Sequence, residues 1–123
     1  MKENLLIDLS KRFAVDIVNL CSEKKEGRKA SVLINQLLRC GTSIGANIHE
    51  ANYASSKADF INKFQIALKE CYETDYWLGL FKDTNMITVD EYNGLFSQCS
   101  KIRKLLIASI TTAKSTRNKN KTF

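Results

Sequence analysis

The sequence predicts an all-α protein that folds as an antiparallel up-down-up-down four-helix bundle. Proline is absent from the 123 residues and glycine occurs only five times, which disfavours the turn-rich chains of β-sandwiches and barrels. Apolar residues recur with a helical period in four segments, whereas no useful length alternates with the period of a strand. Because short polar segments separate long helices, neighbouring helices are expected to be antiparallel. The length indicates a single domain, 1–123.

The first two helices are expected over residues 4–22 and 30–52. A polar, charged loop that contains Gly27 separates them. Each has a continuous apolar face, which is typical of a helix that packs on a core. These faces comprise Leu6, Leu9, Phe13, Ile17 and Leu20 in the first helix, and Leu33, Leu37, Cys40, Ile44, Ile48 and Ala51 in the second.

The third and fourth helices are expected over residues 56–83 and 88–114. Both begin with a hydroxyl residue followed three positions later by an acid, a pattern that resembles a capping box. The apolar pattern ends at Ala113, so we predict that residues 115–123 form a basic, frayed tail. The two capping pairs are Ser56 with Asp59 and Thr88 with Glu91.

The formal charge of +6 is distributed unevenly along the chain. Of nineteen basic residues, twelve lie in residues 1–100 beside all thirteen acidic ones, so this part sums to −1 and the remainder to +7. Two interpretations stay open: cations that complement the dipole of the last helix, and a contact with nucleic acid. The candidate nucleic-acid-binding residues are Lys101, Arg103, Lys104, Lys114, Arg117, Lys119 and Lys121.

The second helix contains two glycines, Gly41 and Gly45, although glycine costs about 1 kcal/mol relative to alanine inside a helix. Spaced four residues apart, they form a flat strip where another helix could approach closely. One interpretation is a tight crossing inside one bundle, and the other is a contact between subunits. Since the glycines lie off the main apolar face, we predict the subunit contact.

Polar residues form a second stripe on this helix, and a mixed stripe lies on the third helix. Arg39 is expected to pair with Glu70 or Glu73, and Asn47 to bridge backbone or carboxylate groups. Such networks more often fix register or an interface than perform chemistry. No nucleophile with a base and an orienting group accompanies them, so we expect no enzyme and no catalytic residue. The stripes comprise Arg39, Ser43, Asn47 and Glu50, and Lys63, Glu70, Glu73 and Trp77.

The four cysteines and the single histidine do not indicate a metal site or a cofactor. Each predicted helix has one cysteine on or beside its apolar stripe, and no Cys-x-x-Cys occurs, so reduced core thiols are the simplest interpretation. His49 is expected to face solvent or an interface. Since no apolar run is long enough to span a bilayer and no signal-peptide pattern is present, we expect a cytoplasmic protein. The cysteines are Cys21, Cys40, Cys71 and Cys99.

Three segments resemble the bacterial "four helix bundle protein" family: RCGTSIGANIHEA at 39–51, SKADFI at 56–61 and ALKECYETDYWL at 67–78. Members of that family include proteins encoded in intervening sequences of large-subunit ribosomal RNA genes. The resemblance, which extends from about Phe13 to Lys114, implies a homopentamer of up-down bundles around a central channel. The family has no agreed catalytic residues. It implies structural or interface roles for Arg39, Ser43, Asn47, Glu50, Glu70, Glu73 and Trp77.

The resemblance also implies kinship with the accessory variability determinant of diversity-generating retroelements, a basic pentamer that binds RNA and a reverse transcriptase. Here residues 1–100 sum to −1, unlike the strongly basic bodies of those proteins. Our leading hypothesis is therefore a non-enzymatic oligomeric RNA-associated protein, of the intervening-sequence type, that binds RNA with low sequence specificity through basic C-terminal segments. The alternative is a protein-interaction scaffold, such as a reverse-transcriptase accessory subunit without intrinsic RNA binding.

Overall fold

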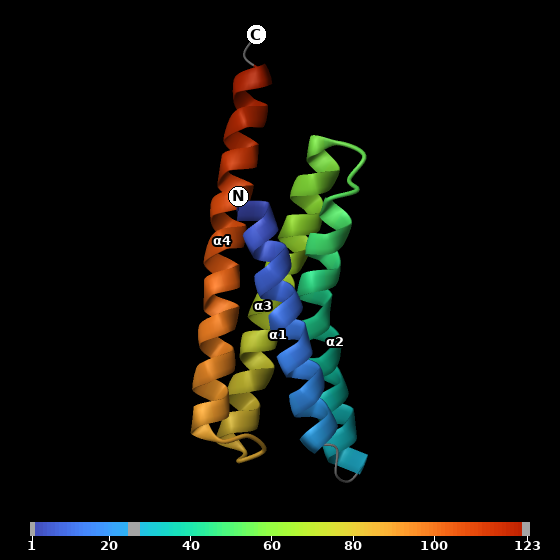
Figure 1. The fold of residues 1–123 in the computed structure, drawn as a ribbon, viewed down its shortest axis with the longest axis vertical. Helices are drawn as coiled ribbons and strands as arrows, with labels where there is room; N and C mark the ends of the chain where they lie inside the picture. The colour runs from blue at the N-terminus through green and yellow to red at the C-terminus, as the bar shows by residue number, and fades with distance from the viewer. Residues whose placement is uncertain (1, 25–27, 122–123) are drawn as a thin grey trace.

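The computed structural model describes the backbone of residues 2–24 and 28–121, and the side chains of residues 4–24 and 30–116. Within these ranges it contains helices and no strand, which confirms the all-α prediction. Successive helices run in alternating directions along the long axis of the molecule (Figure 1). The helices are α1 (Lys2–Lys24), α2 (Arg28–Ala51), α3 (Lys57–Asp83) and α4 (Val89–Lys121).

Each helix packs against two neighbours, so the four helices surround one core. Helix α2 contacts α1 and α3, and α4 contacts α3 and α1, with α1–α4 the least extensive of the four contacts. The largest fully buried side chains include Phe13 of α1 and both Phe64 and Phe81 of α3. The predicted apolar faces therefore do meet in the interior, although Leu9 and Leu33 are only partly buried.

The N-termini of α3 and α4 are capped by the hydroxyl residues that the sequence indicates. The backbone N–H of Asp59 donates to Ser56 Oγ at 3.0 Å. In the second cap, the N–H of Glu91 donates to Thr88 Oγ1 at 3.0 Å, and the Thr88 N–H donates back to Glu91 Oε1 at 2.8 Å. This reciprocal pair is a complete capping box. The two hydroxyl residues precede the helices by one position, so each helix begins one residue later than predicted.

Helix α4 is longer than predicted. We expected it to end at residue 114 and the chain to fray from 115, but the helix continues to Lys121. Its last turns project beyond the other three helices in Figure 1. Beyond Ala113 the helix has no apolar stripe with which to pack on the core. Residues 115–121 nevertheless contain neither glycine nor proline, so nothing in their backbone chemistry interrupts the helical hydrogen bonds. Within the described residues, no helix is long and apolar enough to cross a membrane.

Candidate functional site

The two glycines of α2 lie at the crossing of α1 and α2 inside the chain. Gly41 is buried, and a Cβ atom added there would lie 3.1 Å from both Cγ atoms of Ile17. At Gly45 an added Cβ would lie 3.3 Å from the carbonyl oxygen of Ser10. The tight crossing inside one bundle is therefore present at both glycines, and a subunit contact through Gly41 and Gly45 stays a prediction. Helix α2 buries a second side, which packs against α1. This side includes both glycines and Ile34, which is 2% exposed.

A polar seam joins α2 to α3, and Arg39 is its centre. Its Nη1 donates to Glu70 Oε2 at 3.2 Å, and its Nη2 donates to Glu73 Oε2. The indole N–H of Trp77 donates to the same Glu73 oxygen at 3.2 Å. The hydrogen bond from Arg39 holds the pKa of Glu73 below its usual value, and the same bond raises the pKa of Arg39. The predicted pairing is confirmed with both carboxylates.

The other members of the seam bond within the same chain. Ser43 Oγ donates to the carbonyl oxygen of Arg39 at 2.6 Å, and Asn47 Nδ2 donates to that of Ser43 at 2.8 Å. Farther along, Lys63 Nζ lies 3.1 Å from Glu50 Oε1. Since these ion pairs are partly exposed, each is worth about 0.2–1 kcal/mol. The seam therefore sets the register of α2 against α3, and its part in a subunit contact stays a prediction.

Arg103, a predicted nucleic-acid contact, is bound to α3. Its Nη1 donates to Asp75 Oδ2 at 2.5 Å, and its Nη2 donates to Ser100 Oγ at 3.3 Å. The guanidinium also lies over the ring of Tyr72, 5.6 Å from the centroid. The Arg103 and Asp75 side chains are only 21% and 17% exposed. Burial raises the pKa of Asp75. The Arg103 charge is thus already paired within the chain, and its contact with RNA stays a prediction.

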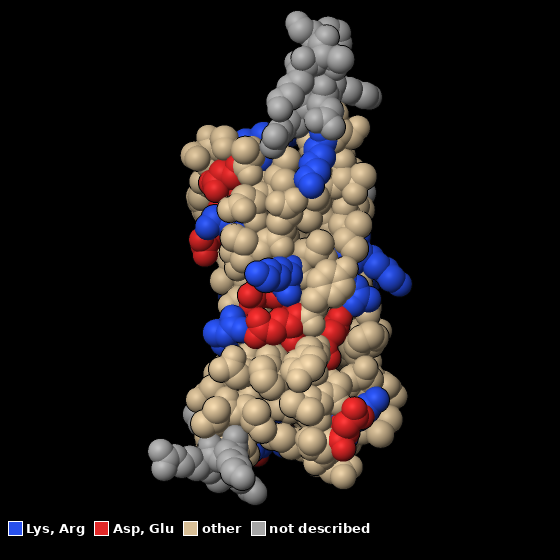
Figure 2. Space-filling model, turned by 180° about the vertical axis from the view of Figure 1, so that it is seen from behind, with Lys and Arg blue, Asp and Glu red and all other residues tan. Residues whose placement is uncertain are grey.

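Figure 2 shows acidic side chains gathered in a band across the middle of one face, with basic side chains around them.

The other predicted cations of α4 differ from Arg103. Lys101, Lys104 and Lys114 are exposed, and none forms an ion pair with a described residue. The predicted contacts Arg117, Lys119 and Lys121 lie outside the described side chains.

All four cysteines are buried and none is in a disulfide, as the core interpretation requires. Burial raises the pKa of the Cys40 thiol to about 11. The pKa of Cys99 is raised as well, mainly by its hydrogen bond with Cys71 and then by burial. His49 is exposed, with its ring centroid 5.5 Å from that of Tyr53. In the described part of the chain, no three His, Cys, Asp or Glu side chains are grouped as metal ligands would be.

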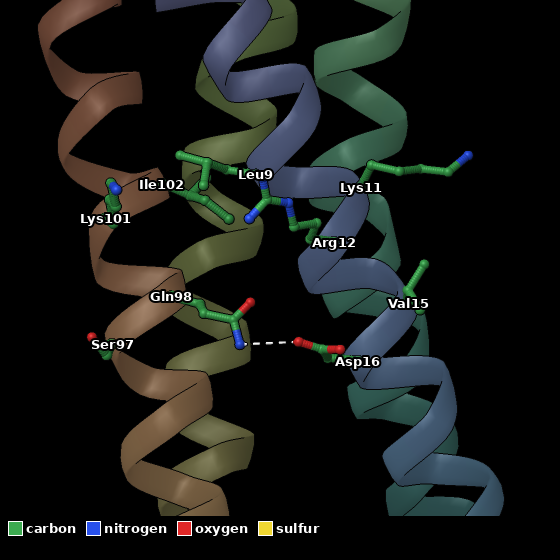
Figure 3. A pocket seen from close by; sticks show the side chains of 9 residues that line it. All are labelled: Leu9, Lys11, Arg12, Val15, Asp16, Ser97, Gln98, Lys101 and Ile102. Carbon is green, nitrogen blue, oxygen red and sulfur yellow. Dashed lines mark hydrogen bonds between the residues drawn. The ribbon is translucent and has the colours of Figure 1, made fainter.

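Sequence reasoning missed a groove between α1 and α4. It has a volume of about 540 Å³ and includes Lys11 and Arg12 from α1 and Lys101 from α4 in its lining; Figure 3 shows these side chains. The periodicity of the sequence indicates which face of each helix is apolar, but not how far apart two helices without a connecting loop will lie. The spacing of cations along one helix therefore gave no signal for this groove.

Comparison with known proteins identifies relatives over most of the chain. The family described as 23S rRNA-intervening sequence protein matches residues 2–108. A crystal structure of a protein of unknown function, from the S23 ribosomal protein family of Bacteroides thetaiotaomicron, is 50% identical. The similarity covers 90% of this chain and 99% of that one, with a TM-score of 0.84. No curated protein matches the chain.

Proposed function

Because the chain belongs to the 23S rRNA intervening sequence protein family, we propose that it is a non-enzymatic RNA-associated protein. It binds RNA with low sequence specificity through its basic C-terminal segment, residues 101–123. The main support is the charge distribution, with seven cations and no acid in this segment against a sum of −1 for residues 1–100. Cations that neutralise phosphates release counterions, and this drives binding without reference to sequence.

The exposure of individual side chains supports the same proposal. Lys101, Lys104 and Lys114 are exposed and form no ion pair with a described residue, so their charges are available to phosphate groups. The only aromatic residue among residues 101–123 is the last one, Phe123, whereas sequence-specific RNA modules stack bases on several aromatic rings. Contacts to the backbone of the RNA are therefore the main contribution. With Arg103 bound to Asp75, six cations of the segment remain for this role.

We further propose that the antiparallel bundle is the protomer of a cytoplasmic homopentamer built around a central channel. Five copies would have a formal charge of +30, which would repeat the basic segment around the assembly. Helix α3 offers apolar surface for such a contact, because Tyr72 and Tyr76 are 53% and 63% exposed one turn apart. Four buried cysteines, none of them in a disulfide, fit a reducing compartment.

The RNA proposal is tested by fluorescence anisotropy with a labelled 20-nucleotide uridine RNA over a series of salt concentrations. The wild type should bind at 50 mM salt and weaken steeply by 200 mM. A variant with R117Q, K119Q and K121Q should lower the slope of log affinity against log salt by about 2, from about 0.7 per lost contact. The matched control, K57Q with K69Q, removes exposed charges from α3 and should leave the slope unchanged.

Two results would contradict the proposal. Absence of binding by the wild type at 50 mM salt would remove RNA association and favour the scaffold alternative. Wild-type affinity and slope in the R117Q/K119Q/K121Q variant would instead show that the C-terminal cations are not the contact. The assembly is tested separately by light scattering, which should give five times 14.0 kDa; a monomer would refute the pentamer.

A further inference from the structure

The groove between α1 and α4 is lined by cations that are far apart in the sequence, two from the first helix and one from the last. We propose that it holds one strand of the RNA sugar–phosphate backbone, with phosphates bound between Arg12 of α1 and Lys101 of α4, and with Lys11 of α1 as a further cation of the lining. This inference rests on the proposed RNA association. It adds a structured contact in the body of the bundle to the C-terminal cations, and it involves two residues of α1 that the sequence did not single out.

The cations occupy both walls of the groove. In Figure 3 the Arg12 guanidinium points from α1 toward α4 and Lys101 lies on α4, whereas Lys11 extends from α1 on the side away from α4. All three side chains are exposed, and none forms an ion pair or a hydrogen bond with another described residue. A phosphate between the walls would therefore meet Arg12 and Lys101 from opposite sides, and Lys11 would add a third positive charge nearby.

Apolar side chains also line the groove. Leu9, Val15 and Ile102 line it, and Val15 is 48% exposed. The space exists because α1 and α4 make the least extensive of the four helix contacts. Such aliphatic side chains can pack against the ribose of a strand whose phosphates are held at the walls. Since no aromatic side chain lines the groove, bases have nothing to stack on there, and the backbone is the recognised part.

One carboxylate limits the affinity of this site. Asp16 lines the groove, and its Oδ2 accepts a hydrogen bond from Gln98 Nε2 of α4 at 3.1 Å, drawn in Figure 3. The lining thus holds three cations and one anion, a net charge of +2. A carboxylate repels a phosphate, so neutralising it should strengthen binding. Asp16→Asn keeps a side-chain oxygen that can accept from Gln98, and it therefore alters the charge while preserving the bridge between the helices.

The test compares two double variants that remove equal charge from exposed positions. K11Q/R12Q changes only α1, outside the C-terminal segment, and K57Q/K69Q is the control on α3. With the 20-nucleotide uridine RNA, K11Q/R12Q should lower the salt slope by about 1.4 and the affinity at 0.1 M salt by about 25-fold, whereas the control should match the wild type. D16N should bind about fivefold more tightly. A gain of affinity cannot result from misfolding.

The possible failures are distinguishable. If the wild type binds RNA and K11Q/R12Q binds equally well, the groove proposal is overturned and the C-terminal contact stands. If both double variants lose affinity equally, general charge and not the groove is responsible, which also overturns it. If K11Q/R12Q keeps its affinity but changes the mass measured by light scattering, a second copy of the chain covers the groove. If the wild type binds no RNA at 50 mM salt, the proposed function itself fails.

Discussion

Replacing Gly41 by alanine sets two opposing effects against each other at the α1–α2 crossing. Alanine is favoured over glycine inside a helix by about 1 kcal/mol. Its Cβ, however, would lie 3.1 Å from both Cγ1 and Cγ2 of Ile17 and 3.5 Å from Ile17 Cβ, where carbon atoms prefer about 3.5–4.0 Å. The close atoms are the branch of a fully buried side chain, whose χ1 angle is stiff. The helices must therefore separate by a few tenths of an ångström.

Overpacking of this kind costs about 1–3 kcal/mol, so Gly41→Ala should lower the free energy of unfolding by about 1 kcal/mol after the helical gain of about 1 kcal/mol is subtracted. The matched control is Gly79→Ala, because an added Cβ at Gly79 meets nothing within 4 Å. It should raise the free energy of unfolding by about 1 kcal/mol. The two substitutions are chemically identical, and only their surroundings separate them by about 2 kcal/mol.

Urea unfolding followed by circular dichroism measures both variants, at one protein concentration because assembly would add to stability. Ile17→Ala alone should lower the free energy of unfolding by about 2–5 kcal/mol. In the Gly41→Ala background the same change also relieves the clash, so the double-mutant cycle should show a favourable coupling of at least about 1 kcal/mol. If Gly41→Ala stabilises the protein as much as Gly79→Ala does, or if the cycle shows no coupling, the close contact is not what requires glycine here.

Three further outcomes follow from the polar and thiol groups. Arg103→Ala leaves the half-buried Asp75 carboxylate without its partner, so urea unfolding should show a loss of about 2 kcal/mol, while RNA affinity by anisotropy stays at the wild-type value. Glu73→Gln should lower the free energy of unfolding by about 0.5 kcal/mol at pH 7. Arg39 lowers the pKa of Glu73 in the native state. The stability difference is therefore fully present above the pKa of the unfolded state, and it should vanish as the pH falls through the native pKa. Burial raises the pKa of Cys40 to about 11, so Ellman's reagent should label it at neutral pH only after unfolding, and rapid labelling of the native protein would contradict its burial.

Local signals in the sequence predicted the helices and their starts well. The hydroxyl caps Ser56 and Thr88 bond to N–H groups only three residues away, so the chemistry that begins each helix lies within one turn of chain. The end of α4 is different, because no capping residue or glycine marks it near Lys114. An apolar stripe reports where a helix has a packing partner, and α4 continues to Lys121 without one.

The contacts that the sequence did not indicate are those whose partners are distant along the chain. Gly41 packs on Ile17 of α1. The apolar pattern of α2 indicates one buried face, and it does not reveal the second side that is buried against α1. Arg103 is neutralised by Asp75, 28 residues earlier. The pairing of Arg39 was predicted correctly because its long side chain and two candidate carboxylates a turn apart tolerate small errors in register.

The distribution of charge shows how pairing across helices changes what a linear sum implies. Residues 101–123 sum to +7 and residues 1–100 to −1, which places all of the excess at one end of the chain. In the folded chain Arg103 is held by an acid of α3, whereas Lys11 and Arg12, inside the nearly neutral part, line the same groove as Lys101. Of the acids that balance them in the sum, Asp16 lines the same groove, whereas Glu70 and Glu73 pair with Arg39. A phosphate strand responds to the local arrangement, so the basic surface of this bundle is expected to include its first helix as well as its last.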